Sequence, residues 1–454
     1  MSALDRIREA MRGTAYEGDL FLVGGAVRDA LLGTPSPDID LVTRGDAPAL
    51  ARRLWERGVG DHAPVIYERF GTAMLTIGGE PIEFVTARRE SYDEGSRKPN
   101  VEPATYREDA ERRDFTLNAL YRDLFTGEIV DPLGVGRADL EALVLRTPLD
   151  PATTFSDDPL RMLRAVRFRH RFGATYAPGL EEAIRAQVGR LAIVSPERIR
   201  EESVKMLDRP SAADAIGDLM RLGLMPYVMP ELIPMVGIDQ GSFHHLDVWE
   251  HTLLAMRNLW DQGAPPDRET SLAVLLHDVG KPPTRMLDDR GKIRFFGHEA
   301  VGADLAREAM RRLRFPNGTI ERVARLVRAH MRLGTAPEFT AAAARRLIRD
   351  LDTDVERLLR VVDADASALA PGVRALDLAP VRARLGEVQE AAPATGYVSP
   401  LSGAEIMART GLPPGPEIGR LKAMLEEAVL AGQLSPDDKA TATTLLDGHA
   451  GDRT

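Results

Sequence analysis

One stretch near the start of the chain, residues 21–42 (FLVGGAVRDALLGTPSPDIDLV), limits the fold more than any other part of the sequence. An apolar run ends in Gly24-Gly25, a helical pattern follows, and a second apolar run closes the stretch. Glycine permits the sharp backbone turn that joins a strand to a helix. The stretch therefore predicts a strand, a helix and a second strand. Asp38 and Asp40 would face the same way on the second strand, because side chains alternate along it.

These residues suit the binding of a triphosphate and a divalent cation. The turn at Gly25 would leave amide groups free at a helix N-terminus, where phosphate binds. Arg28, one turn into the helix, adds a charged hydrogen-bond donor. Asp38 and Asp40 repel each other unless a cation lies between them. Mg²⁺ bound in this way can activate an attacking hydroxyl and stabilise leaving pyrophosphate.

The patterning changes once along the chain. Up to about residue 146, short strand patterns alternate with helical ones, and residues 72–86 read as a hairpin around Gly78-Gly79. Beyond residue 157 nearly all of the patterning is helical. We therefore predict an α+β fold, in which a small mixed sheet flanked by helices precedes an all-helical remainder.

Composition restricts the chemistry. The chain of 454 residues has no cysteine, so any metal must be held by carboxylates and imidazoles. The first residues show no signal-peptide pattern and no apolar run has the length of a membrane span, so we expect a cytoplasmic protein without a membrane partner. The net charge of −10 argues weakly against a nucleic-acid partner. Binding depends on local patches, however, and arginines cluster at 161–171, 307–314, 322–332 and 345–349.

A second group of distinctive residues lies in the helical part. Six of the nine histidines fall between His244 and His330. A lone histidine on an apolar helix face is more often a core residue than a ligand, and the presence of six weakens that interpretation. His251, the pair His277-Asp278, His298 and His330 each lie on or next to a predicted helix, and an acid follows at Asp363 or Asp365. His244 and His245 remain ambiguous.

The motifs of the first part resemble those of a known family. GGAVRD followed by DID, then ERRDFTLNAL, DDPLRMLRAVRF and SPERIREE, resemble in this order the motifs of the class II tRNA nucleotidyltransferases and bacterial poly(A) polymerases. This family is a branch of the polymerase-β-like superfamily, and the resemblance covers nearly the whole chain. The chain departs from the family at Asp157, where the motif usually has Glu.

The resemblance implies roles for individual residues. Asp38 and Asp40 would be catalytic and hold Mg²⁺, and Arg112-Arg113-Asp114 would contact triphosphate and ribose. The DDPLR motif would recognise the base, and SPERIREE would support the recognition helix. The implied nucleotide-binding residues are Gly25, Arg28, Arg113, Asp114, Asp158, Arg161, Arg164 and Arg167.

Asp158 and Arg161 have the chemistry that base recognition needs. They lie three positions apart, on one face of a helix. A carboxylate accepts from the exocyclic amino group of C or A, and a guanidinium donates to the ring nitrogen beside it. U and G present the opposite order of donor and acceptor, so two side chains can replace a nucleic-acid template. The alternative is an amphipathic helix with a basic outer face.

The histidine-rich part resembles the HD phosphohydrolase superfamily in HLDVWEHT and LLHDVGKP. The resemblance implies metal ligation by His251, His277, Asp278 and Asp365, which aligns better than Asp363, with His298 and His330 available for a second ion. Such imidazole-rich sites favour Mn²⁺, Co²⁺ or Ni²⁺. Some tRNA nucleotidyltransferases keep this domain in a degenerate form, as an RNA-binding body, which is the alternative.

The predicted domains are a polymerase-β-like nucleotidyltransferase head (1–146), a helical neck with the base-recognition helix (147–235), an HD domain (236–370) and a helical tail (371–454). The predicted function is addition of CCA to tRNA 3′ ends from CTP and ATP, with possible phosphohydrolase activity in the HD domain. Residues 89–103 match a family loop that is needed for the switch from C to A, and their full length favours complete CCA addition.

Several alternatives stay open at this point. Within the family, these are a poly(A) polymerase and a CC- or A-only adding enzyme. From other classes, they are an HD phosphohydrolase with a nucleotide-sensing head and a non-catalytic RNA-binding scaffold. Glu83 is either a third carboxylate of the site or a solvated strand residue. The oligomeric state is open.

Overall fold

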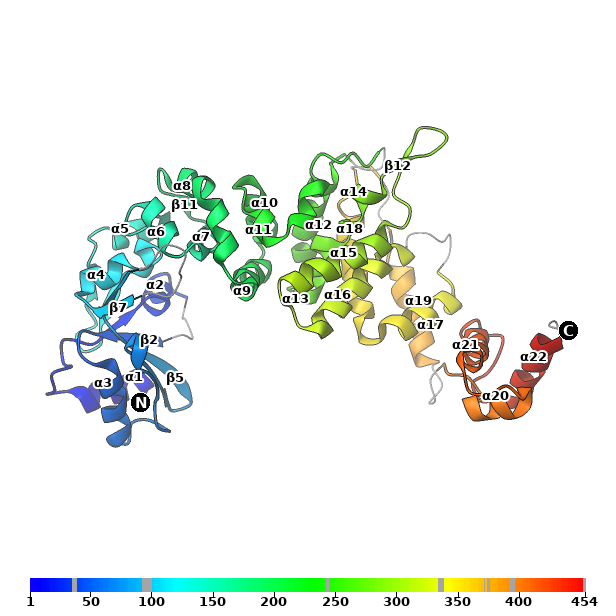
Figure 1. The fold of residues 1–454 in the computed structure, drawn as a ribbon, viewed down its shortest axis with the longest axis horizontal. Coiled ribbons are helices and arrows are strands. Elements are labelled where there is room, and N and C mark those ends of the chain that lie inside the picture. Colours follow the sequence, from blue (N-terminus) through cyan, green and yellow to red (C-terminus); the bar gives the residue numbers. More distant parts are fainter. Residues whose placement is uncertain are drawn as a thin grey trace. The chain divides into compact units, whose positions relative to one another are not determined.

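In the computed structural model, the described residues are 1–34, 39–91, 100–241, 245–333, 339–370, 372–373, 376–391 and 397–451. The chain forms two compact units, Met1–Pro230 and Glu231–Thr454 (Figure 1). Among the described helices, none combines the length and the apolar character that crossing a membrane requires.

The first unit is built on a seven-stranded sheet with the order β3-β4-β5-β2-β1-β8-β9. Its strands are β1 (Phe21–Val23), β2 (Ile39–Thr43), β3 (Val65–Tyr67), β4 (Thr72–Ile77), β5 (Glu80–Thr86), β8 (Tyr121–Asp123) and β9 (Ile129–Val130). β2 and β5 are parallel, whereas β1 and β2 are antiparallel with Val23 opposite Asp40. The end of β1 therefore meets the start of β2, and the turn after β1 lies beside Asp40.

The two faces of this sheet are covered differently. Helix α3 (Ala47–Glu56) packs against β4 and β5, where Leu75 and Phe84 are buried. On the opposite face, Phe21, Val42 and Tyr121 belong to an apolar cluster that includes Ala110 of α4 (Tyr106–Glu111). This second cluster covers the β1 and β8 side of that face.

Shorter elements complete the first unit. The ribbon β6 (Arg88–Ser91) and β7 (Asn100–Pro103) follows β5, and β10 (Val144–Leu145) pairs with β11 (Thr175–Tyr176). The helices are α1 (Ala3–Met11), α2 (Gly25–Leu31), α5 (Gly136–Glu141), α6 (Pro151–Asp157), α7 (Leu160–Phe172), α8 (Leu180–Gln187), α9 (Pro196–Leu207), α10 (Ala212–Arg221) and α11 (Met225–Val228). Helix α7 packs against both α9 and α10, which come later in the chain.

In the described part of the second unit, the regular elements are helices apart from one short hairpin, β12 (Met286–Leu287) and β13 (Ile293–Arg294). Its helices are α12 (Val248–Asp261), α13 (Arg268–Leu276), α14 (Lys281–Thr284), α15 (His298–Arg312), α16 (Asn317–Ala329), α17 (Ala341–Leu351), α18 (Val355–Ala366), α19 (Ala379–Glu390), α20 (Gly403–Thr410), α21 (Pro416–Leu430) and α22 (Lys439–Gly451). Helix α13 packs against α12, α16 and α18, and the last three helices share a separate small core. The mixed sheet followed by helices confirms the predicted α+β class.

Candidate active site and metal cluster

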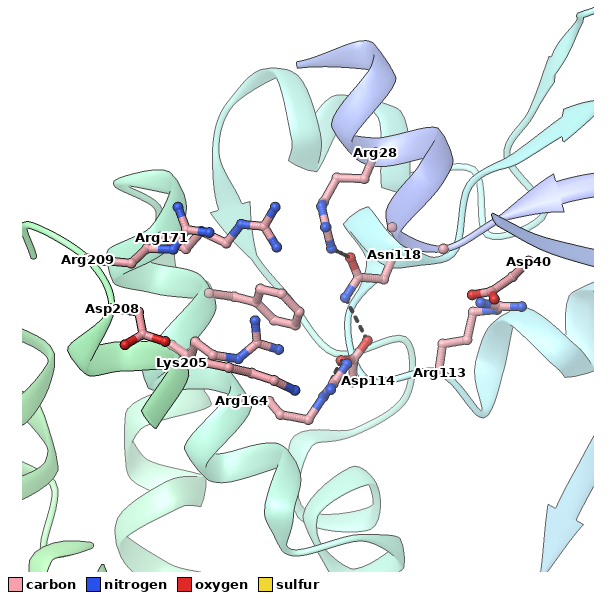
Figure 2. Close-up of a pocket in the computed structure, with 14 residues that line it drawn as sticks. Arg28, Asp40, Arg113, Asp114, Asn118, Arg164, Arg171, Lys205, Asp208 and Arg209 are labelled. Atoms are coloured by element: carbon pink, nitrogen blue, oxygen red, sulfur yellow. Dashed lines mark hydrogen bonds and ion pairs between the residues drawn. The ribbon is translucent and has the colours of Figure 1, made fainter. Parts of the chain in front are cut away.

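One cavity in the first unit collects many of the residues that the sequence singled out (Figure 2). Its volume is about 470 Å³. The β1–α2 turn, β2, the segment after α4, helix α7 and the end of α9 supply its walls. The lining residues are Gly24, Gly25, Arg28, Asp40, Arg113, Asp114, Asn118, Arg164, Arg167, Phe168, Arg171, Lys205, Asp208 and Arg209.

The turn between β1 and α2 forms one end of this cavity. Gly24 has a φ angle of 68°, which glycine adopts without strain. A Cβ atom at this position would lie 3.4 Å from Nη1 of Arg113 and 3.8 Å from Oδ2 of Asp40. Among the described residues, no side chain caps the N-terminus of α2. The first amide groups of this helix are therefore available to an anion.

Asp40 lies next to this turn and is half-buried. Its strand pairs in parallel with β5, which puts Glu83 beside Asp40 in register. Side chains of paired residues share a face of the sheet, so the two carboxylates are neighbours. Asp38 lies outside the described residues. Carboxylate oxygens beside an anion-binding turn are a donor set that suits Mg²⁺.

Arg28 is buried in the cavity wall. Its Nε donates to Oδ1 of Asp29 at 2.7 Å, and its Nη1 donates to Oδ1 of Asn118. The guanidinium lies 5.2 Å from the ring centroid of Phe168 and 4.8 Å from that of Phe172. These contacts hold the charge in one orientation before any ligand arrives, which lowers the entropy cost of binding phosphate.

Asp114 joins the sheet side of the cavity to α7. Its Oδ1 accepts from Nδ2 of Asn118 at 2.8 Å, and its Oδ2 accepts from Nε of Arg164 at 2.8 Å. Burial raises the pKa of Asp114, but Arg164 and the bond from Asn118 outweigh burial and hold the pKa at about 2. Asp114 is therefore ionised at neutral pH and can accept hydrogen bonds from hydroxyl groups.

Glu202 on α9 holds the arginines of α7 in place. It is buried, and its Oε2 accepts from Nε of Arg167 at 2.6 Å. Its Oε1 lies 3.7 Å from Nη1 of Arg164 and 3.4 Å from Nζ of Lys205. One buried acid thus fixes three cations that line the cavity.

The proposed base-reading pair, Asp158 and Arg161, is not part of the cavity lining. Nη2 of Arg198 donates to Oδ2 of Asp158 at 2.8 Å. Arg161 is buried and donates to the backbone carbonyls of Arg112 and Thr154. Both side chains of the pair therefore have protein partners in this structure.

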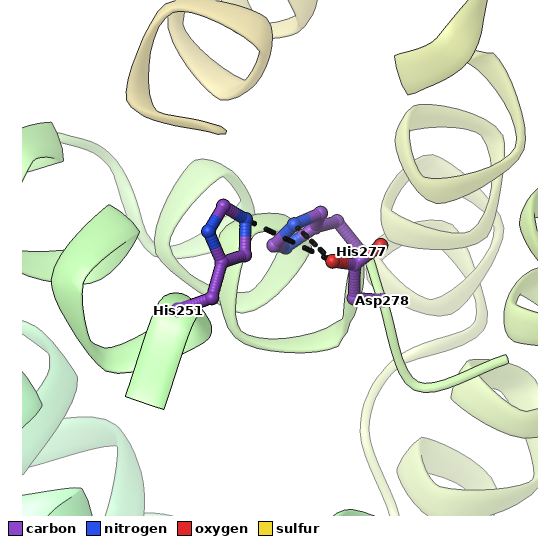
Figure 3. Close-up of side chains that lie close together, drawn as sticks. All are labelled: His251, His277 and Asp278. Carbon is purple, nitrogen blue, oxygen red and sulfur yellow. Dashed lines mark ion pairs between the residues drawn. The ribbon is translucent and has the colours of Figure 1, made fainter. Parts of the chain in front are cut away.

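The second unit holds a buried cluster of histidines and acids (Figure 3). His251, His277 and Asp278 offer ligand atoms within 4.8 Å of one another. Oδ1 of Asp365 lies 2.9 Å from Nε2 of His251 and 3.6 Å from Nε2 of His277. The structure therefore brings Asp365 to the cluster.

A second group shares Asp278 with the first. Asp278, His298 and His330 also have ligand atoms within 4.8 Å of one another. Nε2 of His298 lies 3.5 Å from Oδ1 of Asp278 and 3.2 Å from Nε2 of His330. On the side of the first group, Oδ2 of Asp278 lies 2.6 Å from Nζ of Lys281.

The histidines are oriented as metal ligands usually are. In each, Nδ1 contacts a backbone carbonyl, at 3.2 Å for His251 (Ala368), 2.7 Å for His277 (Val274), 2.8 Å for His298 (Phe295) and 2.6 Å for His330 (Val327). A carbonyl only accepts, so Nδ1 carries a proton, and Nε2 is the ring atom that each imidazole turns toward the cluster. Nε2 of His277 is buried and lies 3.1 Å from Oδ2 of Asp278. These residues fit one or two divalent ions.

Six residues that line the cavity of the first unit were not assigned to the site from the sequence. Asn118 follows Asp114 by four positions, and Arg171 continues the arginine row of α7, so spacing could have suggested both. Lys205 lies in the last turn of α9 and Arg209 two positions after its end, and only the fold decides that this segment approaches α7. Phe168 and Asp208 complete the set.

The sequence matches three known domain families and is similar to two characterised classes of tRNA nucleotidyltransferase. Residues 20–146 match the poly A polymerase head domain, residues 175–235 match the probable RNA and SrmB-binding site of polymerase A, and residues 243–368 match the HD domain. The chain is 37% identical to the A-adding tRNA nucleotidyltransferase of Deinococcus radiodurans, over 93% of this chain and 94% of that protein. It is 36% identical to the CC-adding tRNA nucleotidyltransferase of Thermus thermophilus, over 94% and 93%.

Solved structures have the same fold. The CCA-adding enzyme of Bacillus stearothermophilus, in complex with CTP, superposes with a TM-score of 0.68 at 24% identity, covering 99% of this chain and 97% of that one. The CCA-adding enzyme of Thermotoga maritima, complexed with tRNA, superposes with a TM-score of 0.59 at 19% identity, covering 98% and 95%.

Proposed function

This chain belongs to the family of tRNA nucleotidyltransferases and poly(A) polymerases, and from that premise we propose that it adds CCA to tRNA 3′ ends from CTP and ATP without a nucleic-acid template. The observation that carries the proposal is the cavity in which the β1–α2 turn and Asp40 meet Asp114 and the arginines of α7. We propose that the protein acts in the cytoplasm, where its substrates are.

Each side of this cavity suits one part of a nucleoside triphosphate. The free amides of α2 and the cations Arg28 and Arg113 suit the phosphates. The ionised Asp114 suits the ribose hydroxyls. Mg²⁺ held by Asp38 and Asp40 would activate the attacking 3′-hydroxyl and neutralise charge on the leaving pyrophosphate.

The direct test is an extension assay with tRNA that lacks CCA, supplied with CTP and ATP singly and together, followed by sequencing of the products. We expect CC from CTP alone and CCA from both. Addition of A alone to tRNA ending in CC, or addition of CC alone, would assign the chain to one of the partial activities that its relatives carry. A long A tract would assign it to the poly(A) polymerases.

The segment between β6 and β7 supports complete CCA addition over the partial reactions. Its length matches the family loop that is needed for the switch from C to A, although residues 92–99 lie outside the described part of the chain. Ser91 and Asn100 pair directly in the ribbon. A two-residue turn can therefore join them without disturbing the strands.

Replacing residues 92–99 by a two-residue Asn-Gly turn should stop synthesis after CC. CC addition itself should keep its rate, because the cavity residues are unchanged. The measurement is the product length on tRNA lacking CCA, with tRNA ending in CC as a second substrate. Complete CCA from the shortened protein would refute the role of this segment.

Arg161→Ala should damage nucleotide choice as well as rate. We propose that Arg161 and Asp158 read the base edge, so loss of one donor should raise incorporation of UTP and GTP relative to CTP and ATP by about tenfold or more. The measurement is single-nucleotide incorporation with each triphosphate.

Arg164→Ala is the matched control, because Arg164 lies one turn further along α7 and pairs with Asp114. It should slow all four nucleotides by a similar factor. If Arg161→Ala also slows all four equally, Arg161 does not read the base.

We further propose that the HD domain hydrolyses phosphoesters with a transition metal such as Mn²⁺, Co²⁺ or Ni²⁺. The observation that favours this second activity is the pair of donor groups that share Asp278, each with Nε2 atoms turned inward. Imidazole-rich sites prefer transition metals over Mg²⁺. The substrates would be 2′,3′-cyclic nucleotides or RNA-end phosphates. The alternative is that the cluster is structural and the domain only holds tRNA.

A further inference from the structure

The register of the sheet in the first unit places Asp40 at one end of a row of side chains. Asp40 of β2 pairs with Glu83 of β5, Glu83 pairs with Met74 of β4, and Met74 pairs with Val65 of β3. Paired residues share a face of the sheet, so these four side chains point the same way. Tyr67 points there too, because it lies two positions after Val65 on β3.

This row lies on an open part of the sheet. Met74, Val65 and Tyr67 are 41%, 54% and 49% exposed, and Glu83 is exposed as well. Helix α3 covers the other face, since the amide of Ala47 at its start donates to Oγ1 of Thr86, which shares its face of β5 with the buried Phe84. Large apolar side chains gathered on one exposed face usually mark a binding surface.

The row extends from Asp40 toward the side from which the attacking hydroxyl would approach in nucleotidyl transfer. The triphosphate cavity includes Asp40 but no residue of β3, β4 or β5. In nucleotidyl transfer the attacking and leaving oxygens lie roughly in line on opposite sides of the phosphorus. If pyrophosphate leaves on the α2 side of Asp40, the attacking hydroxyl comes from the other side, where Glu83 and Met74 begin. Three strand spacings separate Asp40 from Val65, a distance of about 14 Å that is enough for the last two or three nucleotides of a single strand.

We propose that this row, Glu83, Met74, Val65 and Tyr67, receives the 3′-terminal nucleotides of the RNA that is extended. The proposal rests on the proposed nucleotidyl transfer to RNA. Met74 and Val65 offer no charge to a phosphate, so they contact the faces of the bases and riboses, and Tyr67 offers a ring on which a base stacks. Recognition of this kind tolerates different bases, as an enzyme that extends successive ends requires.

Site-specific crosslinking tests the proposal, because the chain has no cysteine of its own. Met74→Cys and Val65→Cys carry a photoactivated thiol-linked crosslinker, and Trp55→Cys is the control, since Trp55 is 45% exposed on α3, the helix on the other face. The probe is a tRNA transcript that lacks CCA. We expect both row variants to crosslink to its last three nucleotides, and Trp55→Cys to crosslink to none of these. Crosslinks of the row variants only to upstream nucleotides, or none above the control, would overturn the proposal.

Kinetics give an independent readout. Met74→Glu should raise the KM for tRNA by about tenfold, because it places a charge where a base face should lie, and should leave the KM for CTP within twofold. Trp55→Glu should change neither constant. An unchanged KM for tRNA in Met74→Glu would count against the row. If the unmodified protein extends no tRNA at all, the proposed function fails, while the crosslinks still report whether RNA occupies the row.

Discussion

Asp40→Ala should abolish nucleotide addition, lowering the rate by about a thousandfold or more, and Asp38→Ala should do the same. Phosphoryl transfer depends on positioning and on neutralisation of the charge that develops on the phosphate oxygens. Loss of a carboxylate that holds Mg²⁺ removes this neutralisation, and of the described acids that line the cavity, Asp40, Asp114 and Asp208, only Asp40 lies on a strand that pairs with β1.

The fold should survive the Asp40 substitution. Asp40 is half-buried at the cavity, and the apolar residues Leu41 and Val42 of the same strand carry the packing. The measurements are single-turnover extension of tRNA lacking CCA and the thermal unfolding midpoint of each variant. Near-wild-type extension by either variant would refute the assignment of the catalytic metal.

Asp278→Ala should eliminate metal-dependent phosphoester hydrolysis by the HD domain and leave nucleotide addition intact. Asp278 is the one residue common to both donor groups, so its loss removes a ligand from each. The measurements are hydrolysis of bis-p-nitrophenyl phosphate and 2′,3′-cyclic nucleotides across a series of divalent metals, together with the metal content of the purified protein. Asp40→Ala should keep this activity.

Asp278 is buried and forms an ion pair with Lys281, so its replacement removes a buried ion pair as well as a metal ligand. A second pair of variants distinguishes loss of the ligand from loss of the fold. Asp365→Ala should also lose hydrolysis, whereas Asp363→Ala, two positions earlier on α18, should keep it. If no transition metal copurifies and no turnover depends on Asp278 or Asp365, the histidines are structural and the HD domain serves only to hold tRNA.

The fold class and the family followed from local patterns. The Gly24-Gly25 turn and the spacing of Asp38 and Asp40 need only the period of one strand and the conformational freedom of glycine, so a short window of sequence contains the information. The same holds for β2 and for the hairpin of β4 and β5, whose predicted positions the structure confirms. The predicted α+β class is confirmed for the same reason.

Tertiary structure decided how distant segments meet. Asp365 rather than Asp363 lies at the cluster because the packing of α18 against α12 and α13 sets which side of α18 faces His251. Asn118 connects Asp114 to Arg28, which is 90 positions away from Asn118, and Arg198 pairs with Asp158 across 40 positions.

The sequence by itself thus determined which chemical groups the chain carries and on which local elements they lie, because helix and strand periods act over a few residues. Only the tertiary structure decided the partners of those groups. The row from Asp40 through Glu83 and Met74 to Val65 exists because four strands pair in one register. A shift of one residue in any strand would turn its side chains to the other face. The Gly78-Gly79 turn sets the register of β4 and β5 locally, whereas the pairing of β2 with the distant β5 depends on burial of the apolar residues of the sheet.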